Sequence, residues 1–474
     1  MPDRPTSVVR TEAEAAIILG RFESEHRLFE LSVGGVSLWR LLRFAVGFAL
    51  QNLPFERTPL PRGELLVAFL RSLRDLARLP GGVRYAVKSY VSALRIREED
   101  GYEDIYFERL LEEVPGGVRL FSLNAAGYAA RPGSSGVTAI DCTAVTILGA
   151  LLARAFPVKE GDVAFARLSA LIADDLGLEG FPSGRIRRMF SSFWWQSRLY
   201  EWVLRRLGAG TVLAADTGER ALLAASQRLG AGFIELQHGI FTPDHPDALP
   251  VSALRAAPAA ELLLPDRVAL YGDYWLSRQA GSALGKAGRL LSAGSSVIEK
   301  FRARRETEFS PAKDCPHMVV TTQGIDRDAL IEFLSRFLTL FAEPCVLTVK
   351  LHPAYDSSYG LYIKMLGDDS RVRIVNGRDD PNTYELIARS DLHLSIASAC
   401  HYDALGIGTP TVVIGLAGYP LVQDLLDAGD ALFAGSPEAL AEIVSQRSWK
   451  AVSPAVSSRY YRHEFVQNLL PLIA

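Results

Sequence analysis

The sequence predicts an α/β protein with two doubly wound, Rossmann-like domains and a helical region before them. From about residue 116 onward, short apolar runs alternate with helical stretches, which is typical of βαβ units that build a parallel sheet. A charged, irregular stretch at 301–315 interrupts this alternation, which then starts again. The length of 474 residues leaves room for two or three domains with large cores.

Residues 1–115 are expected to form a mostly helical, basic N-terminal region. Residues 38–50 carry apolar side chains at helical spacing, with Arg40 and Arg43 on the other face. Residues 61–97 follow as a basic stretch in which Leu, Val, Phe and Tyr lie between the charges. Two interpretations of this stretch stay open: a solvated helix face, or an amphipathic surface that docks on an anionic inner membrane.

The first α/β domain is predicted over residues 116–300. Its clearest unit is a strand at 211–215, a helix at 219–229 and a strand that ends at Leu236. A polar, proline-rich loop at 241–250 comes soon afterwards, and loops of this kind often cover a site. The other predicted elements of this domain are strands at 118–123, 137–140, 267–270 and 290–293 and a helix at 144–155.

The second α/β domain is predicted over residues 316–450, after an inter-domain linker at 301–315. Residues 451–474 are expected to form a C-terminal helix, which could cross back to the first domain. The predicted elements of the second domain are strands at 318–321, 345–350, 372–375, 392–396 and 411–414, with helices at 328–341, 383–388 and 400–405. Two such domains lead us to expect a ligand cleft at the carboxyl ends of their strands.

Composition and motifs argue against several classes of protein. A formal net charge of −3 lacks the broad basic footprint of a nucleic-acid binder. The four cysteines form no CxxC pair, which disfavours a disulfide framework or a zinc site. No GxGxxG after a strand, P-loop, HExxH, EF-hand or GxSxG pattern occurs. We therefore expect no dedicated metal site and no cofactor other than a co-substrate.

The N-terminus carries no basic-then-apolar signal sequence, and no run of about 18 or more uncharged apolar residues appears. These observations predict a cytoplasmic protein. Contact with the inner surface of the membrane stays open because of the basic stretch at 61–97.

Two histidine motifs follow predicted strands. His238, in Gln237-His238-Gly239, precedes a flexible glycine, so its imidazole could take a proton from an acceptor hydroxyl, or it could merely fix the turn. His352, in Lys350-Leu-His352-Pro, is displayed by the proline that follows it. Imidazole, with or without the Lys350 ammonium, suits a phosphate oxygen whose charge grows as a leaving group departs. The competing interpretation is a packed histidine at a strand-end turn.

A serine-rich turn follows the strand at 392–396. Ser395 and Ser398 stand just before a predicted helix, where hydroxyls and backbone N–H groups can face an anion. Asp403, one turn into the helix, could accept hydrogen bonds from ribose hydroxyls. Alternatively, Ser398 is only a helix cap and Asp403 only a favourable first-turn acid.

Asp216 and Glu219 follow the strand at 211–215 and offer further candidates. Asp216 could act as a base, as a nucleophile or as the partner that orients His238, whereas both acids could simply cap the next helix. His245 lies in the loop at 241–250 and could contact an acceptor. His393 lies inside an apolar strand and is interpreted as a core residue.

Gln237-His238-Gly239 after a first-domain strand, paired with Lys350-Leu-His352-Pro in the second domain, resembles a known family. The resemblance is to GT-B-fold glycosyltransferases of bacterial surface polysaccharide synthesis, namely the capsule and lipopolysaccharide Kdo- or sialic-acid-transferase type and the CDP-glycerol glycerophosphotransferases. Residues 391–413 resemble the nucleotide-binding half of these enzymes, and residues 31–40 resemble an N-terminal patch of capsule-type members. The resemblance covers roughly residues 210–445.

The resemblance implies a GT-B fold, in which two Rossmann-like domains face each other across a cleft, and metal-independent transfer of a sugar from a nucleotide-sugar donor. A CMP-linked nonulosonic acid is the favoured donor, and a glycan, a lipid-linked sugar or a protein is the acceptor. His352 and Lys350, with Ser395 and Ser398, would hold the donor phosphate. Asp403 would bind the ribose, although many relatives carry the longer Glu there, which puts this contact in question.

The resemblance implies that His238 is the base or an acceptor-side residue. Gln237 and His245 are further candidates for the acceptor side. Stereochemistry stays open because Asp216 stands in Ala-Asp-Thr-Gly rather than in a paired-acid motif. A base at His238 or Asp216 would give inversion, and a nucleophile at Asp216 would give retention. Two alternatives remain: a nucleotide-sugar epimerase or hydrolase of the same fold, and a non-catalytic binding protein.

Overall fold

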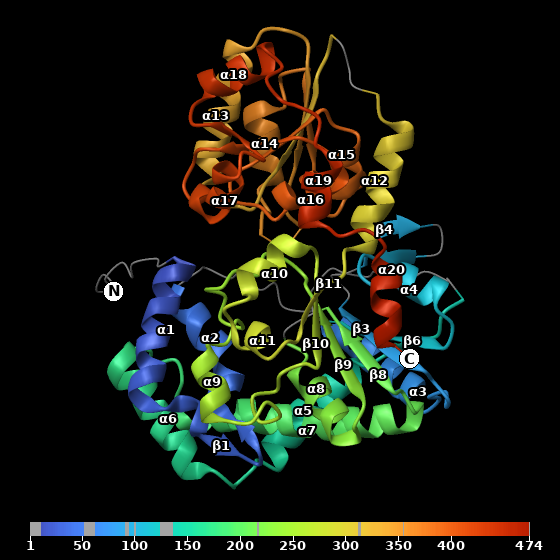
Figure 1. Cartoon of the computed structure of the whole chain (residues 1–474), viewed down its shortest axis with the longest axis vertical. Coiled ribbons are helices and arrows are strands. Elements are labelled where there is room, and N and C mark those ends of the chain that lie inside the picture. Colours follow the sequence, from blue (N-terminus) through green and yellow to red (C-terminus); the bar gives the residue numbers. More distant parts are fainter. Residues whose placement is uncertain are drawn as a thin grey trace. The chain divides into compact units, whose positions relative to one another are not determined.

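The computed structural model forms two compact units (Figure 1). The first unit extends to Leu270 and also includes residues 274–292 and the chain from Val466 onward, so the chain returns to it at the end. The second unit consists of residues 271–273 and 293–465. The structure describes residues 11–51, 62–90, 94–98, 101–123, 136–215, 218–310, 314–353 and 355–473.

A parallel sheet in the order β11-β10-β9-β8-β3-β6-β7 organises the first unit. The winding starts at β3, proceeds to β7 on one side and then reverses to β8 and the strands beyond it. Such a reversal creates a switch point, here between β3 and β8, where open α/β sheets bind ligands. The strands are β3 (Tyr85–Tyr90), β6 (Gly117–Ser122), β7 (Ala139–Asp141), β8 (Thr211–Ala214), β9 (Gly232–Leu236), β10 (Arg267–Leu270) and β11 (Leu290–Ser292).

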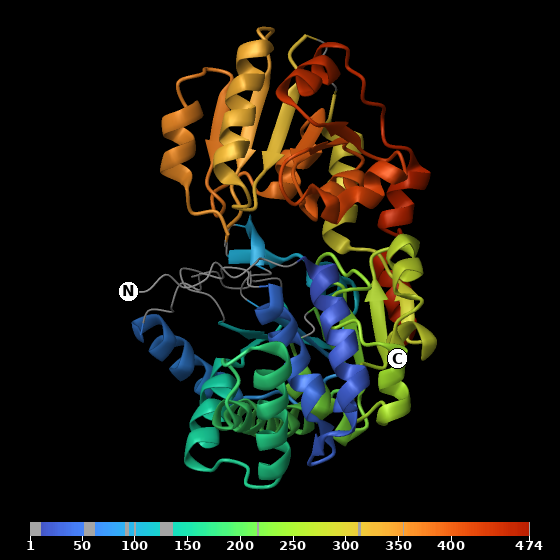
Figure 2. The same ribbon diagram turned by 90° about the vertical axis from the view of Figure 1, so that its left-hand side faces the viewer.

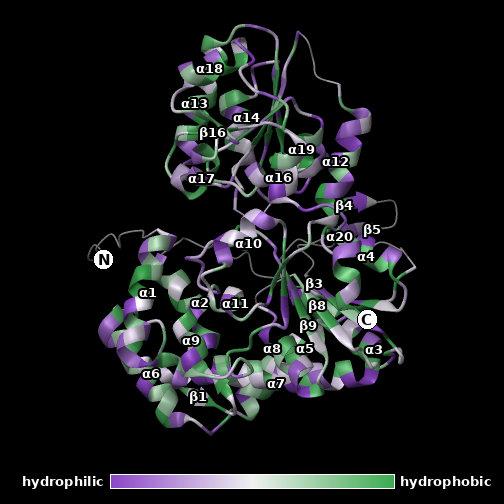
Figure 3. Ribbon diagram, viewed as in Figure 1, coloured by the Kyte–Doolittle hydropathy of each residue, from purple (hydrophilic) through white to green (hydrophobic). Residues whose placement is uncertain are grey.

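Helices cover both faces of this sheet, and α7 packs against α5, α6 and α8. Stripes of hydrophobic and hydrophilic colour run along α1, α6 and α7, as expected for helices with one buried face (Figure 3). The helices are α1 (Glu12–His26), α2 (Leu38–Gln51), α3 (Arg62–Leu76), α4 (Glu108–Glu113), α5 (Thr143–Ala155), α6 (Asp162–Leu176), α7 (Ser183–Leu207), α8 (Arg220–Leu229), α9 (Val251–Ala256), α10 (Asp273–Gln279) and α11 (Ala283–Lys286).

The prediction of a mostly helical region over residues 1–115 is wrong at β3. This strand lies in the middle of the sheet, paired with β6 and β8, although the basic stretch that contains it suggests a solvated helix. Lys88 is nevertheless buried, because its ammonium pairs with Glu219 at 3.0 Å. The same region contains two antiparallel pairs, β1 (Ser32–Val33) with β2 (Val36–Ser37) and β4 (Leu94–Glu98) with β5 (Gly101–Asp104).

The prediction of an irregular linker at 301–315 is wrong as well, because residues 301–308 continue helix α12 (Ser296–Glu308). Phe301 is buried, and two arginines of the helix bind backbone carbonyls of the same unit. Arg302 Nε donates to Gly406 O at 2.7 Å, and Arg305 Nε donates to Gly408 O at 3.0 Å. The charges that suggested a linker therefore fasten the helix to its unit.

A second parallel sheet, in the order β14-β13-β12-β15-β16-β17, organises the second unit. Its winding reverses in the same way, with the switch point between β12 and β15. These two sheets confirm the predicted fold class of two doubly wound α/β domains. The strands are β12 (His317–Thr321), β13 (Val346–Lys350), β14 (Val372–Val375), β15 (Leu392–Ser395), β16 (Thr411–Ile414) and β17 (Leu432–Ala434).

The core of the second unit joins the strands to the helices that pack on them, with Val320, Leu347, Leu394 and Val412 fully buried. Its helices are α12, α13 (Arg327–Leu340), α14 (Tyr359–Leu366), α15 (Thr383–Ala388), α16 (Cys400–Ile407), α17 (Gln423–Asp427), α18 (Pro437–Ser445) and α19 (Pro454–Tyr460). Helix α20 (Phe465–Leu469) then leads the chain back to the first unit. In the part of the chain that the structure describes, no helix is long and apolar enough to span a membrane.

Candidate functional site

Loops that follow four strands converge at the carboxyl edge of the second unit's sheet. Gln323, after β12, donates from Nε2 to Ala397 O, after β15, at 3.0 Å. Thr322 Oγ1 donates to Asp356 Oδ2, in the loop after β13, at 2.6 Å. Because β12 and β15 flank the switch point, this edge is where a ligand of the sheet is expected. The loop after β16 joins them, because Ala417 N–H donates to Asp326 Oδ2 at 3.3 Å. The described residues of the four loops are 322–326, 351–353 with 355–358, 396–399 and 415–419.

Two glycines allow these loops to approach one another closely. Gly324 has φ of +69°, and a Cβ there would lie 2.2 Å from Tyr355 O. At Gly377, after β14, a Cβ would lie 2.5 Å from Pro353 N. A side chain at either position would push the loops apart, so both positions require glycine.

His352 is held in a defined orientation within this cluster. Its Nδ1 accepts the backbone N–H of Tyr355 at 3.1 Å, and its ring stacks on that of Tyr355 with centroids 4.4 Å apart. Its backbone N–H donates to Thr322 Oγ1 at 3.3 Å. Because Nδ1 accepts, the neutral imidazole carries its proton on Nε2 and presents a hydrogen-bond donor there. This arrangement suits a phosphate oxygen, and the contact itself stays a prediction.

Lys350 binds backbone carbonyls of a neighbouring loop, and its predicted contact with the donor phosphate stays a prediction. Its side chain is buried, and its ammonium donates to Asn376 O at 2.9 Å and to Asp379 O at 2.5 Å, both after β14. Burial lowers the pKa of Lys350 to about 8. The residue therefore holds the loop after β14, and contact with a donor phosphate would require these carbonyls to be released.

The two serines of the turn after β15 are both buried, and they use their hydroxyls in opposite ways. Ser395 Oγ donates to Thr321 O at 2.6 Å, which joins β15 to β12. Ser398 Oγ accepts the N–H of Cys400 at 3.1 Å, at the start of α16. A hydroxyl that accepts in this way retains its hydrogen for a second partner. Ser398 is thus better suited than Ser395 to donate to an anion, and both roles stay predictions.

Asp403 lies in the first turn of α16 and accepts a hydrogen bond from the Tyr461 hydroxyl. Burial, and then the charge of Asp403, raise the pKa of Tyr461 well above its ordinary value. The phenol therefore stays protonated and keeps donating. Binding of a ribose hydroxyl by Asp403 would have to share or replace this bond, and the ribose contact stays a prediction.

Two buried histidines, His393 of β15 and His401 of α16, flank the serine turn. His393 bonds Thr321 Oγ1 at 2.9 Å and Thr411 Oγ1 at 2.8 Å, as its interpretation as a core residue requires. His401 bonds the same Thr411 Oγ1 at 2.6 Å. Burial lowers the pKa of His401 to about 3 and that of His393 well below its ordinary value. Both imidazoles are therefore neutral at physiological pH.

In the first unit, the Gln237-His238-Gly239 turn follows β9. A hydrogen bond from the Gln237 side-chain amide stabilises this turn. Gln237 is buried, and its Nε2 donates to Gly239 O at 2.7 Å. The predicted acceptor contact of Gln237 would therefore compete with this bond. His238 has an exposed side chain, and its carbonyl accepts from the Tyr106 hydroxyl at 3.3 Å. An exposed imidazole on a fixed turn is compatible with the predicted base, which stays a prediction.

Glu219 lies at the start of α8, beside the switch point of the first unit. It is buried and pairs with Lys88 of β3 at 3.0 Å. The basic pattern of residues 61–97 predicts a helix, so it does not predict the pairing of Lys88 with Glu219. Asp216, the other predicted acid, lies outside the described residues. The catalytic roles of both acids stay predictions.

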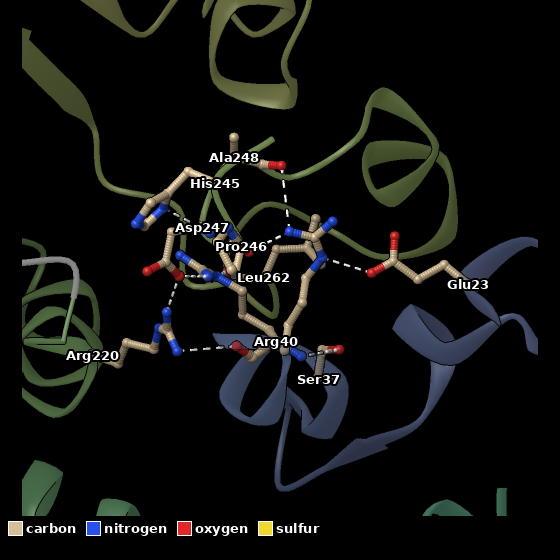
Figure 4. A network of polar contacts seen from close by, with 10 residues as sticks. Glu23, Ser37, Arg40, Arg220, His245, Pro246, Asp247, Ala248 and Leu262 are labelled. Atoms are coloured by element: carbon tan, nitrogen blue, oxygen red, sulfur yellow. Dashed lines mark hydrogen bonds and ion pairs between the residues drawn. The ribbon is translucent and has the colours of Figure 1, made fainter. Parts of the chain in front are cut away.

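The loop at 241–250 is anchored by a buried network of charges (Figure 4). Asp247 accepts from Arg40 Nη1 of α2 at 2.6 Å and also from Arg220 of α8. Burial alone would raise the pKa of Asp247, but the two guanidinium groups hold it well below its ordinary value. Neighbouring Arg43 donates from Nε to Glu23 Oε1 at 2.6 Å. The loop is therefore tied to α2 and α8.

His245 belongs to this network. Its Nδ1 accepts the N–H of Asp247 at 3.1 Å, and its ring lies edge-on to that of Phe241 with centroids 5.4 Å apart. Burial lowers the pKa of His245 to about 4, so it is neutral at physiological pH. This packing shows how His245 fixes the loop, and the predicted contact with an acceptor stays a prediction.

No protein-family model matches the sequence, and no curated protein matches it. Among the residues that the structure describes, no three His, Cys, Asp or Glu side chains gather as they would around a metal ion.

Several solved structures resemble the chain. The UDP-GlcNAc 2-epimerase from Neisseria meningitidis shares 10% identity, with 82% of this chain and 98% of that chain covered and a TM-score of 0.47. MurG from Acinetobacter baumannii shares 11% identity, with coverage of 83% and 99% and a TM-score of 0.42. The wall teichoic acid polymerase TagF shares 11% identity, with coverage of 87% and 97% and a TM-score of 0.44.

Proposed function

We propose that this protein is a glycosyltransferase of the GT-B type that takes a sugar from a nucleotide-sugar donor. The observation that carries the proposal is the convergence of loops at the switch point of the second unit, around an oriented His352. Doubly wound sheets bind nucleotides at such a point. The proposal assigns the donor to this edge and the acceptor side to the His238 turn of the first unit.

The chemistry follows from the orientation of the side chains. As the acceptor oxygen attacks the anomeric carbon, the bond to the nucleotide phosphate breaks and negative charge grows on the leaving oxygen. His352 donates from Nε2 to that oxygen, and Ser398 and the N-terminus of α16 add hydrogen bonds and a favourable dipole. The acceptor's proton goes to His238 or to Asp216, which would give inversion.

The finer assignment follows the resemblance in the sequence. We propose a CMP-linked nonulosonic acid as the donor and a glycan, a lipid-linked sugar or a protein as the acceptor, in the synthesis of bacterial surface glycoconjugates. The donor needs no bound metal in this proposal, because the His352 imidazole, the Ser398 hydroxyl and the N-terminus of α16 supply hydrogen bonds and a favourable dipole to the phosphate. Transfer of the sugar to a membrane-bound acceptor would require the protein to bind at the inner face of the membrane.

Thermal unfolding in the presence of CMP, CDP, UDP, GDP and ADP, with and without magnesium, tests the donor site. A nucleotide at about 100 times its Kd should stabilise the protein by roughly 2.7 kcal/mol. We expect one selective nucleotide, CMP in the favoured case, and loss of its effect in His352→Ala. His317→Ala is the matched control, since His317 lies exposed at the amino end of β12, on the opposite edge of the sheet.

Two results would contradict the proposal: no stabilisation by any nucleotide at millimolar concentration, or an equal loss of stabilisation in both histidine variants. Selective binding without transfer to any acceptor, but with conversion of the free nucleotide sugar, would instead support the epimerase or hydrolase alternative.

A further inference from the structure

Helix α3 turns a row of apolar side chains toward solvent. Leu66, Val67, Leu70 and Leu73 are 57%, 58%, 56% and 39% exposed. Residues at this spacing lie on one face of a helix. Single exposed apolar side chains are ordinary on protein surfaces, whereas a contiguous group marks a contact with another apolar body. We call this group the α3 stripe.

The opposite face of α3 is fixed to the first unit, so the helix cannot roll the stripe inward. Ser72 is buried; its Oγ donates to Asp141 O at 2.6 Å and accepts the N–H of Ala144 at 2.8 Å. Arg71 pairs with the buried Asp141 carboxylate at 2.6 Å. In Figure 1 and Figure 2, α3 lies at the margin of this unit.

Exposed arginines accompany the stripe. Arg62 stands at the first turn of α3, Arg74 at the last turn and Arg78 just beyond it, and all three are exposed. The only exposed acid of the helix is Glu64. Asp75 is half-buried; it accepts the backbone N–H of Asp141 at 3.2 Å and pairs with Arg74 at 3.1 Å. We call these three arginines the basic rim. Its charge is opposite in sign to the net charge of −3 of the whole chain.

We propose that the α3 stripe is a membrane-docking element that lies in the interface of an anionic lipid bilayer. Apolar side chains flanked by arginines combine the two interactions that hold interfacial helices on such surfaces. Fifteen residues give a helix about 22 Å long, which suits a contact in the plane of the membrane. A two-fold dimer through this face would set the rim arginines of one copy against those of the other, whereas anionic lipid attracts them; the charge of the rim therefore favours lipid over a second copy.

Within the basic stretch at 61–97, this proposal assigns the membrane contact to α3 alone. Tyr85–Tyr90 forms a central strand, and Lys88 is buried in an ion pair, so these residues have no access to lipid. The proposal deepens the proposed function, because it names the surface on which a membrane-bound acceptor would be met. Its test uses neither nucleotide nor acceptor.

The experiment is flotation of the full-length protein with vesicles of phosphatidylethanolamine and phosphatidylglycerol, and with vesicles of phosphatidylcholine alone. We expect binding to the anionic vesicles that weakens at high salt. The double variant Leu66→Asn/Leu70→Asn should bind at least roughly tenfold more weakly, because its apolar burial is lost. Arg74→Glu/Arg78→Glu should bind anionic vesicles more weakly without changing the response to phosphatidylcholine.

Val163→Asn is the matched control, because Val163 is 83% exposed on α6, outside the stripe. Circular dichroism and thermal unfolding verify that each variant is folded. Failure of the wild type to bind anionic vesicles would overturn the proposal, as would equal loss of binding in Val163→Asn and in the stripe variant. So would a dimer, seen by light scattering, that the stripe variant dissociates while no vesicle binds. Nucleotide stabilisation measured without vesicles reports on the proposed function separately.

Discussion

At the scale of single residues, buried charge is the most consequential feature of the first unit. Asp247 is one carboxylate between two buried arginines, Arg40 and Arg220, which come from helices far apart in the sequence. The three side chains connect the loop at 241–250 to α2 and α8. Removal of the carboxylate charge leaves two guanidinium groups buried without their partner, which costs far more than the loss of a surface ion pair.

We therefore predict that Asp247→Asn lowers the free energy of unfolding by about 3–5 kcal/mol. Asp244→Asn, at an exposed acid of the same loop, should change it by no more than about 0.5 kcal/mol. Urea denaturation of both variants measures the two effects. Equal stability of the two variants would show that the buried network does not hold the loop.

His245 predicts how stability depends on pH. Its pKa is about 4 in the folded protein against 6.5 ordinarily, so the unfolded chain binds a proton first as the pH falls. The contribution of His245 to the free energy of unfolding is therefore fully present above pH 6.5 and is lost as the pH falls from 6.5 to 4. The difference corresponds to at most roughly 3 kcal/mol.

In His245→Asn, the amide oxygen can still accept the N–H of Asp247, but nothing titrates. The free energy of unfolding of this variant should therefore fall less steeply than that of the wild type between pH 6.5 and pH 4. His393 and His401 contribute to the fall in both proteins and cancel in the comparison. Identical slopes would contradict a neutral His245 in the folded protein.

At the scale of secondary structure, the loops of the second unit depend on glycine where strands end. We predict that Gly324→Ala abolishes nucleotide-dependent stabilisation and costs at least about 1 kcal/mol, because φ is +69° and the new Cβ would lie 2.2 Å from Tyr355 O. Gly360→Ala, inside α14 with no atom within 4 Å of the new Cβ, should instead stabilise the protein slightly. Thermal unfolding with and without nucleotide distinguishes the two, and similar behaviour would refute the tight-turn explanation.

Most elements could be predicted because their periodicity was undisturbed. The helix at 383–388 and the strand at 411–414 have the same bounds in sequence and structure. Charges misled the prediction in two places: Lys88 looks solvated but is neutralised by Glu219, and Arg302 in α12 binds a backbone carbonyl. Both partners lie more than 100 residues away, and no local pattern reveals them.

Part of the candidate site, like most of the helices and strands, could be predicted from the sequence. His352 and Ser398 follow strands of clear periodicity, so their place at the carboxyl edge could be foreseen. No sequence motif points to Thr322, Gln323 or Asp356, because their roles come from hydrogen bonds between loops that only the fold brings together. A search for polar residues after every predicted strand, and not only for histidine and serine motifs, would have included Thr322 and Gln323.

At the scale of the whole molecule, the two units repeat one winding but differ in what they place at the switch point. The first unit has a buried ion pair there, Lys88 with Glu219, whereas the second has cross-bonded loops and an oriented His352. We therefore expect the second unit to bind the nucleotide. The α3 stripe belongs to the first unit, so lipid binding and nucleotide binding should be separable by mutation.

Hydrogen–deuterium exchange with and without the stabilising nucleotide tests whether the second unit holds the donor site. We predict slower exchange in the loops after β12, β13 and β15 of the second unit, with the effect absent in His352→Ala and retained in His317→Ala. Slower exchange confined to the first unit, or unchanged exchange in these three loops at saturating nucleotide, would contradict the assignment of the donor site.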